Sequence, residues 1–273
     1  MTRQLKRPLS YIIVIVAVVL SLFPFVWLLL TSLKPEALTF AIPPAWVFRP
    51  TLDSYEQVFL HSPFARYFLN SLAVALGTTV LALASGTLAA YAFARFRFFG
   101  NTSLQVLMLL PKVIPPVAII IPLFVLFQGV GLIDNHLALI LSYLSFTIPI
   151  AVWMMIGFIR DVPVSIEESA IIDGASKTQV LTRIVLPIVA PGMAATAILC
   201  FIYSWNEFLY AVILTGRTAK TVPVAITGFI TNRDILWGRI AASGTVVLMP
   251  VFIFALSVQR HLVRGLSQGA IKG

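Results

Sequence analysis

Charged residues are scarce in this chain of 273 residues: Asp, Glu, Lys and Arg make up 11% of it, while hydrophobic residues make up 59%. An ordinary soluble domain has about 25% charged residues. A chain of this length cannot bury so much apolar surface inside a soluble core, and the mean hydropathy of +0.98 agrees. The scarcity of charge therefore excludes a soluble fold and predicts an integral membrane protein.

Residues that build covalent, metal or nucleotide sites are also rare. The single cysteine, Cys200, excludes a disulfide within the chain. The three histidines are scattered and there is no H-E-x-x-H sequence, so we expect neither a metal site nor catalytic residues. Residues 174–178 superficially resemble the end of a P-loop, but Ser176 replaces the required glycine. We therefore expect no nucleotide to bind this chain.

Long apolar runs, by contrast, are abundant. A membrane-spanning helix needs about 20 predominantly apolar residues, and six runs meet that need. We expect an all-α membrane protein with a single transmembrane domain over residues 1–273 and spans at residues 11–33, 67–94, 102–127, 137–159, 191–216 and 240–259. The first run is longer than the core of a signal peptide and lacks a cleavage site, so we expect it to be retained.

The distribution of basic residues predicts the orientation of these spans. Six spans put both termini on one side, and that side then holds eleven of the nineteen Lys and Arg residues. Seven lie on the opposite side, and Lys112 lies within the third span. Because basic residues concentrate in the cytosol, we expect cytosolic N- and C-termini. This also accounts for the net charge of +9 without nucleic acid as a partner.

The second and third spans carry distinct patterns. Small residues recur at every fourth position of the second span, which favours close approach of another helix: Thr78, Ala82, Gly86, Ala90 and Ala94. Four prolines must break or bend the third span: Pro111, Pro115, Pro116 and Pro122. Carbonyl groups freed by such a break need protein or water partners. We therefore expect the third span to line a cavity.

Polar groups inside the spans are candidates for a translocation path. Trp205, Asn206 and Glu207 offer an aromatic face and a polar lining for a hydrophilic solute. Hydrogen bonding between helices of different subunits is an equally good explanation of Asn206 and Glu207. Lys112 is better explained as a side chain that snorkels from a bent helix.

A proton-carrying Glu207 would make the protein an ion- or proton-coupled secondary transporter of a small polar solute. The absence of an internal sequence repeat argues against that class. A membrane scaffold without transport is a third alternative. An intramembrane enzyme lacks support because no nucleophile is paired with a base.

The one sizeable segment on the expected cytosolic side, residues 160–190, predicts two short helices. Ser165 and Glu168 have the spacing of a capping box that begins the first helix. Gly174 supplies the left-handed residue that ends it.

A second capping box, formed by Ser176 and Gln179, begins the second helix, which we expect to end at Pro187. The pair is too short to fold alone. Physical reasoning leaves two arrangements open, a helix docked in a groove of a partner protein or an amphipathic pair on the bilayer surface.

The same segment resembles the EAA loop of binding-protein-dependent ABC importer permeases. The family pattern is E-A-A-x3-G-x9-I-x-L-P, and residues 168–187 match it except at Ser169, where one small residue replaces another. Asp173-Gly174-Ala175 is typical of the carbohydrate-uptake branch, whose permeases resemble the maltose-importer subunit MalG. The similarity extends to residues 204–208, to Gln259-Arg260 and to the tail at 265–273.

This resemblance implies a type I ABC importer permease with a coupling helix that sits in a cleft of a cytosolic ATPase. The ATPase-coupling residues that it implies are Glu168, Ser169, Ala170, Asp173, Gly174, Ala175, Ile184, Leu186 and Pro187. A second implied contact with the ATPase is formed by Ser267, Gln268 and Gly269.

The resemblance also implies a set of partners in a bacterial cytoplasmic membrane. They are a second homologous permease subunit, an ABC ATPase dimer and a periplasmic or lipid-anchored solute-binding protein. The implied substrate is a sugar or a related carbohydrate or polyol. ATP and Mg²⁺ would be bound by the ATPase, and no cofactor by this chain.

Overall fold

The computed structural model describes residues 2–232 and 234–269, with side chains described for residues 11–232, 234–254 and 256. Within this part, the regular elements are helices, and one isolated bridge pairs Ile230 with Ile235. The chain divides by its contacts into two compact units. The first contains residues up to Arg66 together with Ala225–Met249, and the second contains Tyr67–Val224 together with residues from Pro250 onward.

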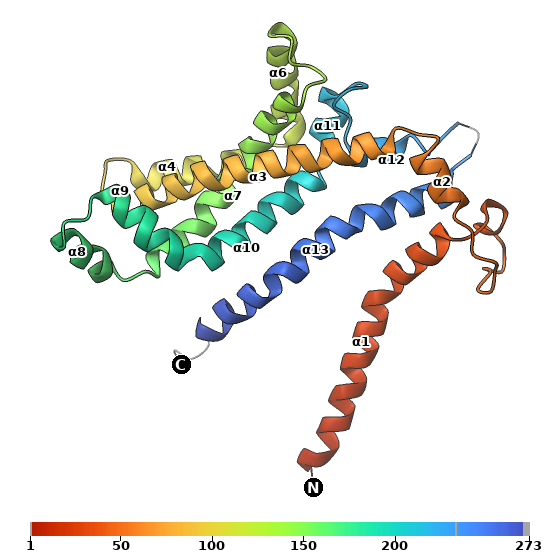
Figure 1. Ribbon diagram of the computed structural model, residues 1–273, viewed down its shortest axis with the longest axis horizontal. Helices are drawn as coiled ribbons and strands as arrows, with labels where there is room; N and C mark the ends of the chain where they lie inside the picture. Colours follow the sequence, from red (N-terminus) through yellow and green to blue (C-terminus); the bar gives the residue numbers. More distant parts are fainter. Residues whose placement is uncertain (1, 233, 270–273) are drawn as a thin grey trace. The chain divides into compact units, whose positions relative to one another are not determined.

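Five helices in the described part are long and apolar enough to cross a membrane, and a bent pair provides a sixth crossing if it is one span. Figure 1 traces them in chain order. The five are α1 (Thr2–Ser32), α3 (Phe64–Arg95), α7 (His136–Arg160), the continuous helix Lys177–Trp205 that ends with α10 (Leu186–Trp205), and α13 (Trp237–Gly269). The predicted all-α membrane fold is therefore confirmed.

The proline-rich third span is broken, as its sequence predicts. It consists of α4 (Asn101–Leu107), α5 (Leu110–Val113) and α6 (Pro116–Gly129), and the chain bends by 91° between the last two. Proline is favoured at the first position of a helix because its missing N–H is not needed there, so Pro116 begins α6. Lys112 is exposed, and its Nζ lies 5.7 Å from the ring centroid of Tyr203.

The fifth span differs from its predicted bounds at both ends. Pro187 does not end a helix: α9 (Lys177–Gln179) passes through the π-helical turn η2 (Val180–Val185) directly into α10. The wider π-helical turn accommodates a proline that would otherwise interrupt the i→i−4 bonds. At the far end, α10 stops at Trp205, and a separate helix α11 (Leu209–Leu214) follows.

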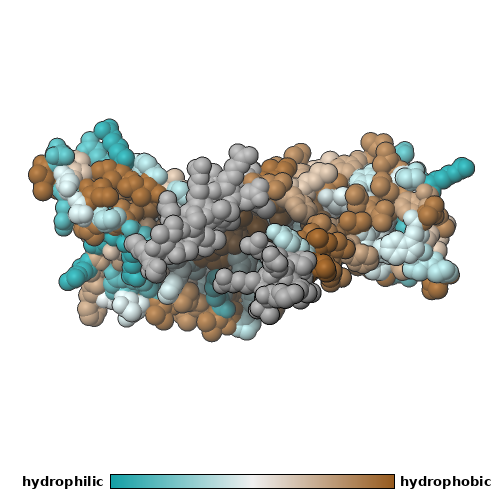
Figure 2. All heavy atoms as spheres, turned by 90° about the horizontal axis from the view of Figure 1, so that it is seen from below, coloured by the Kyte–Doolittle hydropathy of each residue, from teal (hydrophilic) through white to brown (hydrophobic). Residues whose placement is uncertain are grey.

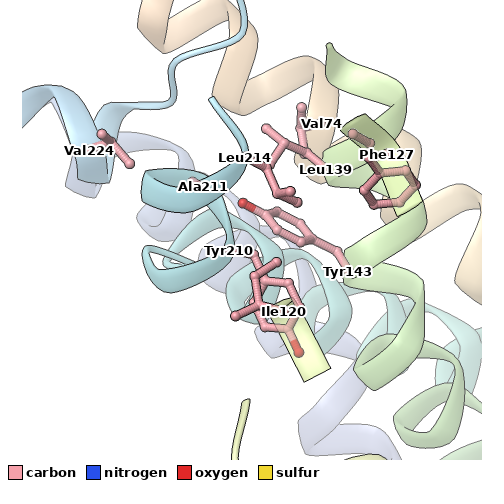
Figure 3. Close-up of a cluster of buried hydrophobic side chains, with 10 residues drawn as sticks. Val74, Ile120, Phe127, Leu139, Tyr143, Tyr210, Ala211, Leu214 and Val224 are labelled. Carbon is pink, nitrogen blue, oxygen red and sulfur yellow. The ribbon is translucent and has the colours of Figure 1, made fainter. Parts of the chain in front are cut away.

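A hydrophobic cluster in the second unit joins these broken helices to the long ones. It is formed by side chains from α3, α6, α7, α11 and the short helix α12 (Val222–Thr227). Figure 3 shows the ring of Tyr143 at the centre of the cluster, with Leu139, Leu214 and Ile120 around it. Packing against this common core fixes α6 and α11 although neither continues a long helix.

The stripe of small residues on α3 faces α7, as predicted. Ala82 and Ala90 are fully buried. A Cβ atom built on Gly86 would lie 2.6 Å from the Cβ of Ala151 and 3.3 Å from the backbone nitrogen of Val152. These distances leave no room for a side chain, so the small residues are what allow the two helices to touch.

The first unit combines α1 with the short helices η1 (Glu36–Leu38) and α2 (Asp53–Phe59) and with the first part of α13. The buried ammonium group of Lys34 lies 4.5 Å from the ring centroid of Trp27 and 5.5 Å from that of Phe48. Most apolar side chains of α1 are exposed. Figure 2 shows, in brown, that hydrophobic side chains also reach the surface on the face it displays.

We expect Gly86→Leu to destabilise the protein by about 3 kcal/mol, because overpacking at a helix contact costs about 1–3 kcal/mol or more. Ala84→Leu is the matched control, since Ala84 is exposed on the same helix. Thermal unfolding of the purified chain in detergent, followed by tryptophan fluorescence, measures both. Equal stability of the two variants would contradict the close contact of α3 with α7.

Candidate functional site

The segment between α7 and α10 forms the predicted pair of short helices joined at a glycine. The first is α8 (Val164–Ile172), and Gly174 has a φ of +90°, in the left-handed region that favours glycine. Ser176 accepts a hydrogen bond from the backbone N–H of Gln179, whose side chain accepts one from the backbone N–H of Ser176. The second predicted capping box is thus confirmed.

The first predicted capping box is not formed. Helix α8 begins at Val164, one residue before Ser165, and no side chain caps it. Pro163 occupies the capping position in an extended conformation, so Ser165 already lies inside the helix. There its carbonyl oxygen accepts a hydrogen bond from the hydroxyl of Ser169.

The inner face of α8 is anchored by a buried ion pair. Arg95 Nε, at the end of α3, donates a hydrogen bond of 2.6 Å to Glu167 Oε1, and both side chains are at most 10% exposed. The hydroxyl of Tyr91 donates to Glu167 Oε2. Arg95 Nη2 also donates to the carbonyl oxygens of Ile159 and Val162, at 2.7 and 2.8 Å. One guanidinium therefore connects α3, the end of α7 and α8.

The outer face of α8 and the turn after it are exposed. Glu168, Ser169, Asp173 and Gly174 all lie on this surface. Ile172 is 85% exposed. This surface therefore combines a carboxylate, a backbone turn and an exposed apolar side chain.

The remaining residues of the motif mostly face inward. Ala170, Ala175 and Leu186 are partly buried against a hydrophobic cluster that includes Val180 and Val185. Ile184 is half-buried and Pro187 is exposed. The motif thus divides into an exposed part and a packed part.

The three residues predicted to line a translocation path lie in different environments. The ring of Trp205 is buried and stacks on Phe201 at a centroid distance of 5.5 Å. Asn206 is exposed, and its amide donates to the carbonyl oxygen of Ile202. The carboxylate of Glu207 accepts hydrogen bonds from backbone N–H groups at the start of α11. Their part in a translocation path stays a prediction.

The predicted tail contact lies at the end of the described chain. Ser267, Gln268 and Gly269 belong to α13, but their side chains lie outside the described part, as do residues 270–273. Their contact with an ATPase also stays a prediction.

A second cluster of polar contacts lies at the opposite end of α7. Asp134 accepts hydrogen bonds of 2.8 to 3.1 Å from the backbone N–H groups of Gly216, Arg217, Thr218 and Ala219. Burial alone would raise the pKa of Asp134, but these four backbone donors outweigh it and hold the pKa well below its ordinary value. Asp134 therefore remains charged and holds the loop after α11.

Side chains near the start of α3 hold the same loop from another direction. Asn70 Nδ2 donates to the carbonyl oxygens of Thr218 and Lys220, at 2.8 and 2.9 Å. Asn70 Oδ1 lies 2.9 Å from His136 Nε2. The hydroxyl of Ser71 accepts from the backbone N–H of Val222. This loop is consequently fixed by side chains of α3 and by Asp134, which lies between α6 and α7.

Glu167, Arg95 and Asp134 are the main residues that sequence reasoning missed. One signal was available, because Tyr91 and Arg95 are four residues apart and so share a face at the end of a span. Nothing in the sequence around Asp134 marks its partners, which lie more than 80 residues away.

We expect Glu167→Ala to lower the free energy of unfolding by about 3–5 kcal/mol, because it leaves the buried Arg95 without its carboxylate. Glu168→Ala is the matched control, since Glu168 is the exposed neighbour and its removal should change stability by at most about 0.5 kcal/mol. Thermal unfolding measures stability, and limited proteolysis of residues 160–190 reports local loosening. Similar behaviour of the two variants would refute the anchoring role.

We expect Asp134→Asn to destabilise the protein by about 2 kcal/mol at neutral pH, because hydrogen bonds to charged groups are the stronger ones. A carboxyl group whose pKa is lowered by folding stabilises the fold at every pH above its ordinary pKa of 3.8. In stronger acid the group becomes protonated and this stabilisation is lost. The difference in Tm between wild type and variant should therefore narrow below about pH 4. Asp161→Asn, an exposed position, is the control. A gap that does not depend on pH would argue against the charge of Asp134.

Comparison with known proteins agrees with this geometry. The chain is 39% identical over 251 residues to a probable ABC transporter permease protein, y4oR, of Sinorhizobium fredii, with 92% of this chain and 90% of the relative covered. It is 37% identical to the trehalose transport system permease protein SugB of Mycobacterium tuberculosis, with 93% of each covered. It is 34% identical to the trehalose/maltose transport system permease protein MalG of Thermococcus litoralis, with 98% of each covered.

Solved structures show the same fold. A bacterial ABC transporter that imports the acidic polysaccharide alginate contains a chain that matches with a TM-score of 0.75 at 21% identity, covering 95% of this chain and 98% of that one. Residues 82–268 match the family model described as "binding-protein-dependent transport system inner membrane component". The protein therefore belongs to this family and is a permease subunit of an ABC importer.

Proposed function

We propose that this permease subunit imports a sugar or a related carbohydrate or polyol and takes its driving force from a separate ATPase through α8. The observation that carries this proposal is the division of α8 into two faces. Its inner face is tied to the spans through Glu167, while its outer face exposes Glu168 and Ile172. A partner can bind the outer face of such a helix, and the resulting movement is passed to the spans through the inner face.

The substrate class rests on the names of the relatives. Transport system permeases named for trehalose, for trehalose and maltose, and for sulfoquinovosyl glycerol are 34–37% identical to this chain over nearly its whole length. These relatives support a carbohydrate as the cargo, and they carry different sugars according to their names.

The proposed complex contains a second homologous permease, a cytosolic ABC ATPase dimer and a periplasmic or lipid-anchored solute-binding protein. The ATPase binds ATP and Mg²⁺ in this proposal. The N- and C-termini, α8 and the end of α3 lie in the cytosol, and the loop held by Asp134 lies outside. A loaded binding protein drives the cycle only through different affinities for the inward-open and outward-open states.

The first test is purification of the tagged full-length chain in mild detergent and identification of the proteins that accompany it. We expect an ATPase, a second permease and a solute-binding protein. Recovery of the chain alone, or only as a homodimer, would favour the secondary transporter. Uptake that persists with an uncoupler but requires ATP separates the two mechanisms independently.

We expect Glu168→Lys to reduce ATP-driven uptake in proteoliposomes about tenfold, because it reverses the charge of the outer face of α8 without changing its anchor, and coupling between sites is typically worth about 5–150-fold. Gly174→Asp should act similarly by adding a charged side chain at the exposed turn. Asp161→Lys, an exposed acid ahead of α8, makes the same change of charge and serves as the control. Full uptake by both Glu168→Lys and Gly174→Asp, at normal membrane levels, would refute the coupling role.

A further inference from the structure

A basic cavity of about 420 Å³ lies beside α8 and shares Arg95 with the anchor described above. Its walls come from the end of α3, the start of α4, the end of α7 and the start of α8. The polar groups that line it include Arg97, Arg160, Asn101, Thr102 and Gln105. Ligand pockets typically have volumes of about 300–1,000 Å³, so the cavity has room for a small polar group.

Two of the arginines in this cavity have uncompensated charge. The guanidinium of Arg95 is occupied by Glu167 and by two backbone carbonyls. Arg97 and Arg160 are exposed, and neither has a carboxylate oxygen within 4.0 Å among the residues that the structure describes. The cavity is therefore lined by two arginines that lack an acidic partner, and guanidinium groups are well suited to bind phosphate oxygens in pairs.

Two of the other polar residues, Asn101 and Gln105, form hydrogen bonds at the wall of the cavity. Asn101 Nδ2 donates to the carbonyl oxygens of Phe93 and Phe96, and Gln105 donates to Asn101 Oδ1. These bonds close the turn between α3 and α4. A site whose walls are already fixed loses little entropy when a ligand binds.

The surroundings place this cavity at the depth of lipid headgroups. It lies where two candidate spans, α3 and α7, end. Between α3 and α4, Phe98 is 40% exposed and Phe99 is fully exposed. Basic residues gather at the ends of spans, and exposed Phe side chains beside basic ones are typical of segments that lie at the membrane surface. Basic pockets between spans bind anionic lipid headgroups.

We propose that the cavity lined by Arg97 and Arg160 binds a phosphate group, and that its source is the headgroup of an anionic phospholipid. Free inorganic phosphate has the same chemistry and is the alternative source. The site requires only that the protein spans a membrane. Its assignment to the cytosolic leaflet rests on the proposed function, and failure of the carbohydrate proposal would leave the site intact.

The test is native mass spectrometry of the full-length chain, purified in detergent and incubated with phosphatidylglycerol or with phosphatidylcholine. We expect wild type to retain phosphatidylglycerol preferentially. The double variant Arg97→Ala/Arg160→Ala should reduce that retention at least about threefold, because two charges that attract an anion are lost. Arg183→Ala removes an exposed arginine of α9–η2 outside the cavity and is the matched control.

A charge-preserving variant, Arg97→Lys/Arg160→Lys, should retain more phosphatidylglycerol than the alanine variant, and equal melting temperatures show that all variants are folded. A calorimetric titration with inorganic phosphate distinguishes the two sources. If wild type binds phosphate, the alanine variant does not, and neither retains phosphatidylglycerol preferentially, the ligand is a soluble phosphate and not a lipid headgroup. Equal retention of phosphatidylglycerol by wild type and the alanine variant, with no phosphate binding, would overturn the proposal. So would loss of a co-purifying subunit with unchanged lipid retention, because the cavity would then be a protein interface.

Discussion

A segment between two spans is too short to build a core of its own, and in this protein a buried charge pair supplies its attachment. Arg95 and Glu167 lie almost completely out of solvent, so each has lost most of its hydration. Their mutual attraction offsets that loss only because further hydrogen bonds, from Tyr91 and to two carbonyls of the α7 end, satisfy the remaining groups. A contact of this kind contributes defined geometry more than net stability. It holds α8 in one position relative to the ends of α3 and α7.

In the proposed mechanism, this fixed position allows a force on the exposed face of α8 to reach the spans. A partner that contacts Glu168 and Ile172 meets a helix whose opposite face is bonded to two spans. Displacement of α8 must therefore either move the ends of α3 and α7 or break buried ionic contacts. The close packing of α3 on α7, with Gly86 against Ala151, extends this link along the spans, because packed interiors do not deform continuously.

The sequence was sufficient for features that depend on local chemistry. Five long apolar helices, the break in the proline-rich third span and the left-handed turn at Gly174 all follow from composition, from the geometry of proline and from the conformational freedom of glycine. The bounds of the fifth span did not follow, because a π-helical turn carries the chain through Pro187. Ser165 failed as a cap because Pro163 already occupies that position.

The part of the candidate site that could not be predicted depends on partners distant in sequence. The motif identified Glu168 as a candidate site residue. Its neighbour Glu167 differs from it in lying on the buried face of α8, and the sequence alone does not show which face is buried. Asp134 has no motif at all, and its role comes from a loop that begins 82 residues later.

Glu167 and Asp134 nevertheless follow one rule. Each lies beyond one end of α7, outside that helix, and each accepts several hydrogen bonds: Glu167 from side chains of α3, and Asp134 from backbone N–H groups of the loop after α11. Unpaired polar groups are costly near a bilayer, and a single carboxylate accepts several donors at once. A chain with only ten acidic residues places two of them where they fix a connection on each side of the membrane-spanning helices. Charged groups are costly near a bilayer. This cost explains both why the chain has few acidic residues and why these two accept several hydrogen bonds each.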